Sequence, residues 1–470
     1  MAFFLALLYL AVAFLGTQTV FGPLRLYHIE ELLLILVISF SLPALQKTFV
    51  QKTVQSLALA GLSMAVFLSV AIGFNYPRGA VTQFVDFLPN AFAYFLVVLH
   101  CKTKLRLQML ILVLFGVCVW VIVQGTLELE TTGGIFATQV SDDSDLHEAA
   151  PEVNLVDPNA ITYLYAQPSS EGGVIYRLKG QEFLSDPNDF GQLLVCVLPL
   201  IFIFWRPKRT VRNLLIVGPM IAVIGYGIFF THSRGALLAV MGVVFVAFRH
   251  KIGTVLSVIL GGGLFIGAMA LNVTGGREIS ASAGSDRTAL WGDGLQMLKG
   301  HPIFGVGYGE MADLLGMTAH NSVIVCAAEL GLFGLFFWSL FLFPTMRDVL
   351  AVASPNGLTD AVPVPVDESP LAYAAPRMEK LGKEDVHQMG RLVMLSLVGF
   401  LVAAMFLSRA FVMTLFLLGG LAEVVFQMAL DRGMITPRLP FGRTLAYSGI
   451  LWIVMIPGMY AIIRVLNLLH

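Results

Sequence analysis

Three basic side chains, Arg234, Arg287 and His320, stand where apolar stretches of the chain end or begin, and their types suit chemistry at a phosphate group. Arg234 lies in "FFTHSRGALLAV", a polar break between two apolar runs, and His320 directly precedes the apolar run 321–343. The arginine guanidinium binds phosphate oxygens through two parallel hydrogen bonds and stays charged. Histidine can take a proton from a hydroxyl near neutral pH. Attack of a sugar hydroxyl on a lipid pyrophosphate donor would use both functions.

The alternative for each residue is structural, because a boundary arginine or histidine can anchor a helix at the lipid headgroups. Two further candidates for substrate contacts are Asn321, next to His320, and Trp291, one helical turn after Arg287. Trp291 is alternatively an interfacial anchor. Arg177 is either a third phosphate contact or a solvated loop charge.

The elements that must position these residues are membrane helices. Of the 470 residues, 57% are hydrophobic and 13% charged, against about 25% charged residues in a typical soluble domain. Long apolar runs recur along the chain, and each can cross a bilayer core of roughly 30 Å. We therefore predict an all-α polytopic membrane bundle of about 12–13 spans, with a large outer-face loop that carries short amphipathic helices. The predicted spans are 1–21, 30–45, 54–73, 83–99, 107–125, 188–205, 211–230, 235–248, 252–272, 321–343, 391–407, 410–430 and 444–463.

Lys and Arg gather in alternate loops, which predicts the orientation because short cytoplasmic loops are enriched in these residues. The pattern places the N-terminus in the cytoplasm and the C-terminus outside. The first run lacks the basic region of a cleavable signal peptide, so we expect it to stay as a helix. The predicted division is 1–125 N-terminal spans, 126–187 acidic outer-face loop, 188–272 central spans, 273–320 outer-face catalytic loop, 321–345 span, 346–390 flexible cytoplasmic linker and 391–470 C-terminal spans.

The outer segment 273–320 holds two local signals. Residues 286–299 predict a short amphipathic helix at the interface, with Arg287 in its first turn after a cap at Ser285 or Asp286. The stretch "HPIFGVGYG" then predicts a turn, in which the glycines permit unusual backbone angles.

Several other polar residues favour structural roles. Glu329 and Glu423 lie within apolar spans, where an acid needs a partner, and we expect a helix-to-helix hydrogen bond or a pair with an arginine. Arg409 is predicted to be a loop arginine. Asp186 and Asn188 are predicted to cap the helix that begins near residue 188.

Neither a metal site nor a cofactor is predicted. The four cysteines are isolated, and three of them lie inside apolar runs. No metal-ligand spacing, disulfide framework or paired acidic motif stands in the outer loops.

Three motifs in order resemble the O-antigen ligase and polymerase superfamily: "THSRGALLA", "DRTALWGDGLQMLKGHPIFGVGYGEM" and "AHNSVIVCAAELGLFGLFFW". The resemblance covers about 225–345, and "RLKGQEFLSDPNDFGQLLVCVLPL" extends it to about 177. It implies a metal-independent membrane glycosyltransferase of the bacterial inner membrane, with its active site on the periplasmic or outer face. Arg234 and Arg287 would bind the donor pyrophosphate, and His320 would orient or deprotonate the acceptor hydroxyl.

The implied partners are an undecaprenyl-pyrophosphate-linked glycan donor, a hydroxyl acceptor and the lipid bilayer, with no nucleic acid. We favour a polymerase of O-antigen or exopolysaccharide, because the "DPNDFGQ" style of segment resembles exopolysaccharide polymerases. The alternatives are a ligase that transfers the glycan to lipid A-core and an enzyme that modifies protein. A transporter of lipid-linked glycan is the rival from another class, but the charges here gather at one face rather than at the midplane of two corresponding halves.

Overall fold

The structure of the protein is a computed structural model. It describes residues 1–16, 29–50, 53–134, 137–139, 161–169, 173–270, 281–354, 356–360, 381–436 and 438–469, without the side chains of 46–50, 138–139, 250, 269–270, 281–287, 462–463 and 466–469.

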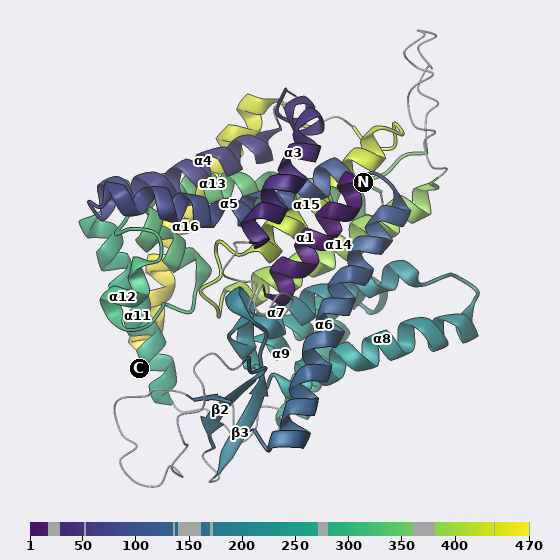
Figure 1. Cartoon of the computed structure of the whole chain (residues 1–470), viewed down its shortest axis with the longest axis horizontal. Coiled ribbons are helices and arrows are strands. Elements are labelled where there is room, and N and C mark those ends of the chain that lie inside the picture. The colour runs from purple at the N-terminus through teal and green to yellow at the C-terminus, as the bar shows by residue number, and fades with distance from the viewer. Residues whose placement is uncertain are drawn as a thin grey trace.

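Every predicted span coincides with a helix, so the predicted all-α membrane bundle is confirmed (Figure 1). Among the described residues, nine helical segments are long and apolar enough to cross a membrane. The helices at the predicted spans are α1 (Ala2–Leu15), α3 (Ile29–Val50), α4 (Val54–Leu68) with η2 (Ser69–Gly73), α5 (Pro77–His100), α6 (Lys104–Thr132), α7 (Pro187–Leu200) with η4 (Ile201–Phe204), α8 (Thr210–Phe230), α9 (Arg234–Ile252), α10 (Thr254–Ala270), α13 (Ser322–Ala353), α14 (Lys383–Ala404), α15 (Met413–Leu430) and α16 (Phe441–Leu469).

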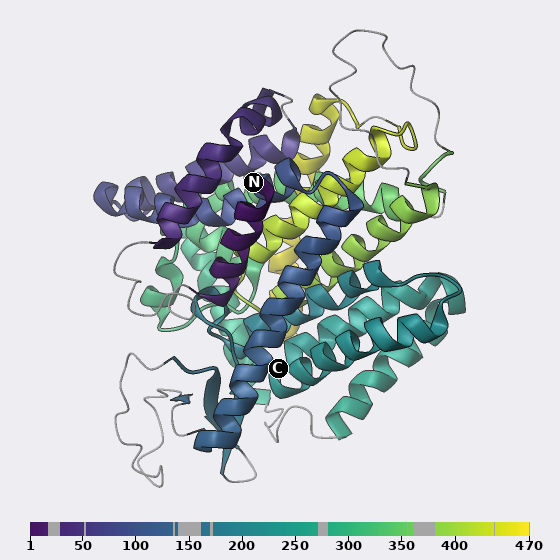
Figure 2. The same cartoon turned by 45° about the vertical axis from the view of Figure 1, so that its right-hand side comes forward.

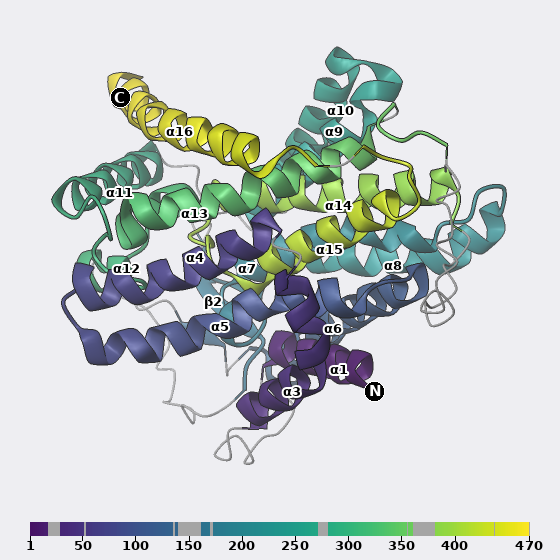
Figure 3. The ribbon, with the colours of Figure 1, turned by 90° about the horizontal axis from the view of Figure 1, so that it is seen from above.

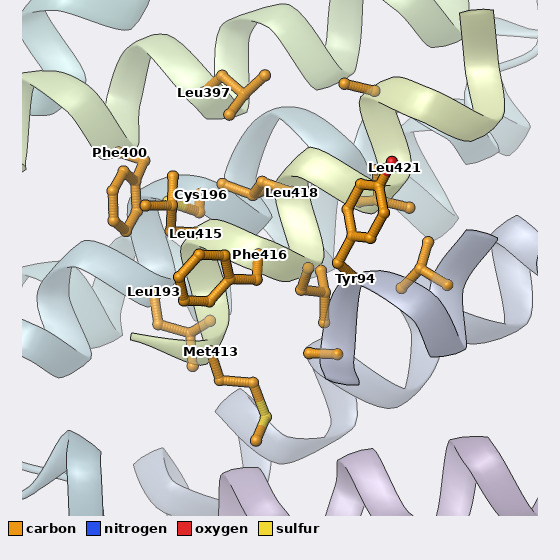
Figure 4. Packing of buried hydrophobic residues seen from close by; sticks show 14 of the residues in the cluster. Tyr94, Leu193, Cys196, Leu397, Phe400, Met413, Leu415, Phe416, Leu418 and Leu421 are labelled. Carbon is orange, nitrogen blue, oxygen red and sulfur yellow. The ribbon is translucent and has the colours of Figure 1, made fainter. Parts of the chain in front are cut away.

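Helix α15 forms the centre of the bundle. Helices α5, α13 and α14 pack around it (Figure 3). Its Phe416 meets the rings of Phe87 and Phe341 with centroids 5.8 and 5.4 Å away, and Tyr94 and Phe400 lie in the same cluster (Figure 4). A helix that is apolar on all sides is buried in this way. On one flank of the core, α9 lies between α10 and α14 (Figures 2 and 3).

The helices alternate in direction, as the basic loops predict. Lys104 at the start of α6 pairs with Asp385 at the start of α14, at 2.5 Å. Gln55 near the start of α4 donates to Asp348 near the end of α13, at 3.1 Å. These contacts gather the basic loops at one end of the bundle. The starts of α7, α9 and α13 therefore share the opposite end, which we call the site end.

A small sheet at the site end was not predicted. It consists of β1 (Thr138–Gln139), β2 (Leu164–Pro168) and β3 (Val174–Leu178) in the order β1-β2-β3. β1 pairs parallel with β2, and β2 pairs antiparallel with β3, with Tyr165 opposite Arg177. The predicted loop 126–187 thus contains strands as well as the end of α6, while its acidic stretch 142–157 lies outside the described residues.

Two further helices follow α10. The predicted helix at 286–299 is confirmed as α11 (Ala281–Gly300), and α12 (Glu310–Leu315) follows it. The predicted caps were wrong, because α11 begins earlier, so that Ser285 and Asp286 lie inside it and Arg287 is in its second turn. The predicted linker 346–390 is shortened at both ends by α13 and α14, and its part 361–380 lies outside the described residues.

Candidate functional site

Arg177 joins the sheet to two helix ends. Its side chain on β3 is only 3% exposed. Its Nε donates to the carbonyl oxygen of Thr231 at 2.9 Å, its Nη1 to Gln167 at 3.2 Å and its Nη2 to the Oδ1 of Asn188 at 3.0 Å. The alternative of a solvated loop charge is therefore wrong, whereas a phosphate contact stays a prediction.

Asn188 links the starts of α7 and α9. Its Oδ1 also accepts a hydrogen bond from Ser233 Oγ at 2.8 Å, and Ser233 caps α9 by accepting from the N–H of Ala236 at 3.3 Å. Asp186 caps α7 as predicted, accepting from the N–H of Asn188 at 2.6 Å, but the predicted cap at Asn188 was wrong because its side chain makes these other contacts. Arg234, the first residue of α9, is thereby fixed at the site end.

Asp189 and Arg409 form a buried ion pair that the sequence interpretation missed. Arg409 Nε donates to Asp189 Oδ1 at 2.5 Å, and Nη2 donates to Oδ2, so the pair is bidentate. The carboxylate is 4% exposed and the guanidinium side chain 31%. Burial lowers the pKa of Arg409, but the charge of Asp189 outweighs this and leaves the pKa above its usual value. Arg409 lies in a loop as predicted, yet it joins α7 to the α14–α15 connection.

His320 sits in a constrained backbone at the start of α13. Its φ is +47°, in the left-handed region that residues with a side chain seldom adopt. Its N–H donates to Ser408 Oγ at 2.9 Å. Asn321 caps α13, because its Oδ1 accepts from the N–H groups of Val323 and Ile324 at 3.0 and 3.2 Å.

Helix α11 contacts Ala319, the residue before this histidine. Trp291 Nε1 donates to the carbonyl oxygen of Ala319 at 2.7 Å. The indole N–H of Trp291 is therefore already hydrogen-bonded within the protein. Arg287 lies four residues earlier, about 6 Å along the helix axis, and its side chain is outside the described part of the structure.

Helix α13 is broken one third of the way along, at Gly331, where φ is +65° and ψ is −164°. The glycine-rich segment 302–307 packs against this break and pairs with its backbone groups. Val306 and Gly307 donate backbone hydrogen bonds to Ala328 and Glu329, and Leu332 and Phe333 donate to Pro302 and Ile303, over 2.9 to 3.1 Å. Irregular backbone at membrane depth survives only where its polar groups are satisfied in this way. The predicted unusual angles are confirmed by positive φ values at Gly305, Gly307 and Gly309.

Of the two intramembrane acids, Glu423 has the structural role that we expected. Glu329 is only 4% exposed, and the backbone N–H groups of Gly309 and Met311 at the start of α12 lie near its carboxylate. Glu423 pairs with Arg438 at the opposite end of the bundle.

The contacts connect most of the predicted site residues through one network. Arg177, Asn188 and Ser233 lead to Arg234, and Asp189, Arg409 and Ser408 lead to His320, followed by Asn321 and Trp291. The network thus places Arg234 and His320 at the same end of the bundle. In the described part of the chain, no three His, Cys, Asp or Glu side chains gather as they would around a metal ion.

Residues 190–339 match the family model described as O-antigen ligase. A search of curated proteins found no match. The matched segment runs from α7 through the break in α13 and includes Arg234, Arg287, Trp291, His320 and Asn321. Residues 190–339 of this multi-pass membrane chain are thus similar to the O-antigen ligase family.

Proposed function

We propose that the protein is a membrane glycosyltransferase that transfers or polymerises glycans from an undecaprenyl-pyrophosphate carrier. The proposal rests on one observation: Arg234 and His320, at the starts of α9 and α13, lie at the same end of the bundle and are joined through one network of contacts. In the cell, the site end faces the periplasm of a bacterial inner membrane, because the basic loops at the other end favour the cytoplasm.

Arg234 and Arg287 act on the donor. As the bond between the anomeric carbon and the pyrophosphate oxygen breaks, negative charge develops on the leaving undecaprenyl pyrophosphate. Preorganised guanidinium groups stabilise this charge and do the work of a divalent cation. The start of α9 adds the positive end of its helix dipole beside Arg234.

His320 acts on the acceptor. Its imidazole takes the proton from the attacking hydroxyl as the new carbon–oxygen bond forms, and the proton is later lost to solvent. Asn321 and Trp291 support this step by holding the backbone on either side of the histidine, since Asn321 caps α13 and Trp291 bonds Ala319. Arg177 holds the α8–α9 turn in place through Thr231 and is a further candidate contact for phosphate.

The favoured acceptor is a second carrier-linked glycan, which makes the enzyme a polymerase. The alternative is transfer to lipid A-core, and the description of the matched family as O-antigen ligase favours it.

Purified protein in nanodiscs tests the proposal when it is incubated with lipid-linked repeat units, with and without lipid A-core. A ladder of lengths without core indicates a polymerase, and a product only with core indicates a ligase. His320→Ala serves as the matched control and should form little of either product. Movement of lipid-linked glycan across vesicles without any new glycosidic bond would overturn the proposal in favour of a transporter.

A further inference from the structure

We propose that Ser408, Arg409 and Asp189 form a positioning bracket, which holds the His320 imidazole at a fixed place relative to Arg234. The inference rests on the proposed function, because it needs His320 to act on the acceptor. None of the three is assigned to contact the reacting atoms.

The first part of the bracket fixes the histidine backbone. A left-handed residue with a side chain persists only where its surroundings hold it. The N–H of His320 donates to Ser408 Oγ, the N–H of Arg409 donates to Ser322 Oγ at 2.9 Å, and that hydroxyl donates to the carbonyl oxygen of Leu407 at 2.8 Å. Residues 407–409 are therefore bonded to the chain on both sides of Asn321. The backbone angle at His320, and with it the direction of its Cβ, depends on this loop.

The second part ties the loop to α7. The bidentate pair between Arg409 and Asp189 holds the connection between α14 and α15 against the first turn of α7. The neighbouring Asn188 holds Ser233, which precedes Arg234. Thus one short path of charged and polar contacts joins the start of α9 to the start of α13. This path fixes the separation of the donor and acceptor ends of the site.

The ion pair also removes the repulsion that an unpaired Asp189 carboxylate would exert on the donor phosphates. A bare carboxylate beside a pyrophosphate site would repel the donor, whereas Asp189 paired with Arg409 is neutral as a unit. Charge-assisted bidentate bonds also give geometric precision that a neutral side chain lacks. The pair therefore gives rigidity without opposing anion binding.

Single-turnover transfer rates test the bracket in a double-mutant cycle. Ser408→Ala and Asp189→Asn are each made in the wild-type chain and in His320→Ala, with lipid-linked repeat units as donor and acceptor. Because misplacement of a reacting group by about 1 Å can cost roughly 100-fold, we expect each single variant to lower the maximal single-turnover rate by about 10- to 100-fold. The donor concentration that gives half of this rate should change less than about twofold. In the His320→Ala background both substitutions should leave the residual rate nearly unchanged.

Two controls separate positioning from folding. Ser408→Thr retains the hydroxyl and should restore most of the rate. Gln192→Met removes a different contact of α7, the 3.2 Å hydrogen bond from Gln192 Nε2 to the carbonyl oxygen of Phe400 in α14, and should leave the single-turnover rate unchanged. Thermal unfolding of each variant shows whether the measured protein is folded.

The outcomes distinguish the bracket from the proposed function. Full rates for Ser408→Ala and Asp189→Asn, with His320→Ala impaired, would overturn the bracket and leave the function standing. Losses that are equally large in the His320→Ala background would also overturn it, because the residues would then act as general scaffold. A full rate for His320→Ala itself would remove the base from the mechanism and the bracket with it.

Discussion

Substitution of Gly331 by alanine should damage both the fold and the transfer reaction. At φ +65° and ψ −164° the backbone is in a region that essentially only glycine adopts, and a residue with a side chain there costs roughly 1–3 kcal/mol. The new Cβ would lie 2.4 Å from the carbonyl oxygen of Ile303 and 2.6 Å from the nitrogen of Gly305, so the backbone of the 302–307 segment has to move. If two of its four hydrogen bonds to α13 are lost, at about 0.5–1.5 kcal/mol each, the total is about 2–6 kcal/mol.

The activity should fall for a related reason. The first third of α13 carries Asn321 at its start and Glu329 next to the break, and the carbonyl oxygen of Glu329 is bonded to Gly307 in the segment that Gly331→Ala displaces. Denaturant unfolding in nanodiscs measures the stability, and the single-turnover rate of the folded protein measures the effect on the site. Gly292→Ala in α11 is the matched control, because nothing lies within 4 Å of its added Cβ, and it should be neutral or stabilising by up to about 1 kcal/mol. A Gly331→Ala protein with wild-type stability and rate would refute this account of the broken helix.

Three further predictions test the orientation, the donor contact and the role of metal. Engineered cysteines at 145 and 283 should react with an impermeant maleimide from outside and one at 360 should not, against a low background because the four native cysteines are buried; labelling at 360 would reverse the orientation. Arg287→Lys keeps the charge but loses the planar fork, so the transfer rate should drop markedly and Arg287→Ala should drop it further; near-normal rates in both would leave Arg287 as an interfacial anchor. Chelation with EDTA should leave the rate unchanged, and a loss that Mg²⁺ restores would contradict the metal-independent mechanism.

The spans were predictable because a backbone in lipid must satisfy its own hydrogen bonds, which makes each long apolar run a helix. The break in α13 was not, since hydropathy treats "ELGLFGLFF" as continuous and the partner segment of Gly331 is known only in three dimensions. The small sheet was not predicted for another reason. Its strands have at most five residues, too few for an alternating pattern to stand out.

The residues that we propose for the chemistry were easier to find in the sequence than those that hold them. Arg234 and His320 lie at the edges of apolar runs, where a basic residue stands out from the surrounding apolar sequence. Asp189 and Arg409 are 220 positions apart in the sequence, so no local sequence pattern predicts their ion pair. A signal for Asp189 was nonetheless present, because an acid at the edge of an apolar span requires a partner.

The central claim, that His320 acts on the acceptor while the arginines hold the donor, is tested most directly by measuring donor binding and single-turnover transfer in the same variants. His320→Ala should lose about 10²–10⁴-fold in transfer and still bind the lipid pyrophosphate, with His320→Asn similarly impaired. Arg234→Ala should lose donor binding as well. For the wild-type protein, transfer should fall at acid pH as protonation removes the acceptor nitrogen of the ring. Substantial transfer by both His320 variants would contradict the account and leave the arginines as the whole of the site.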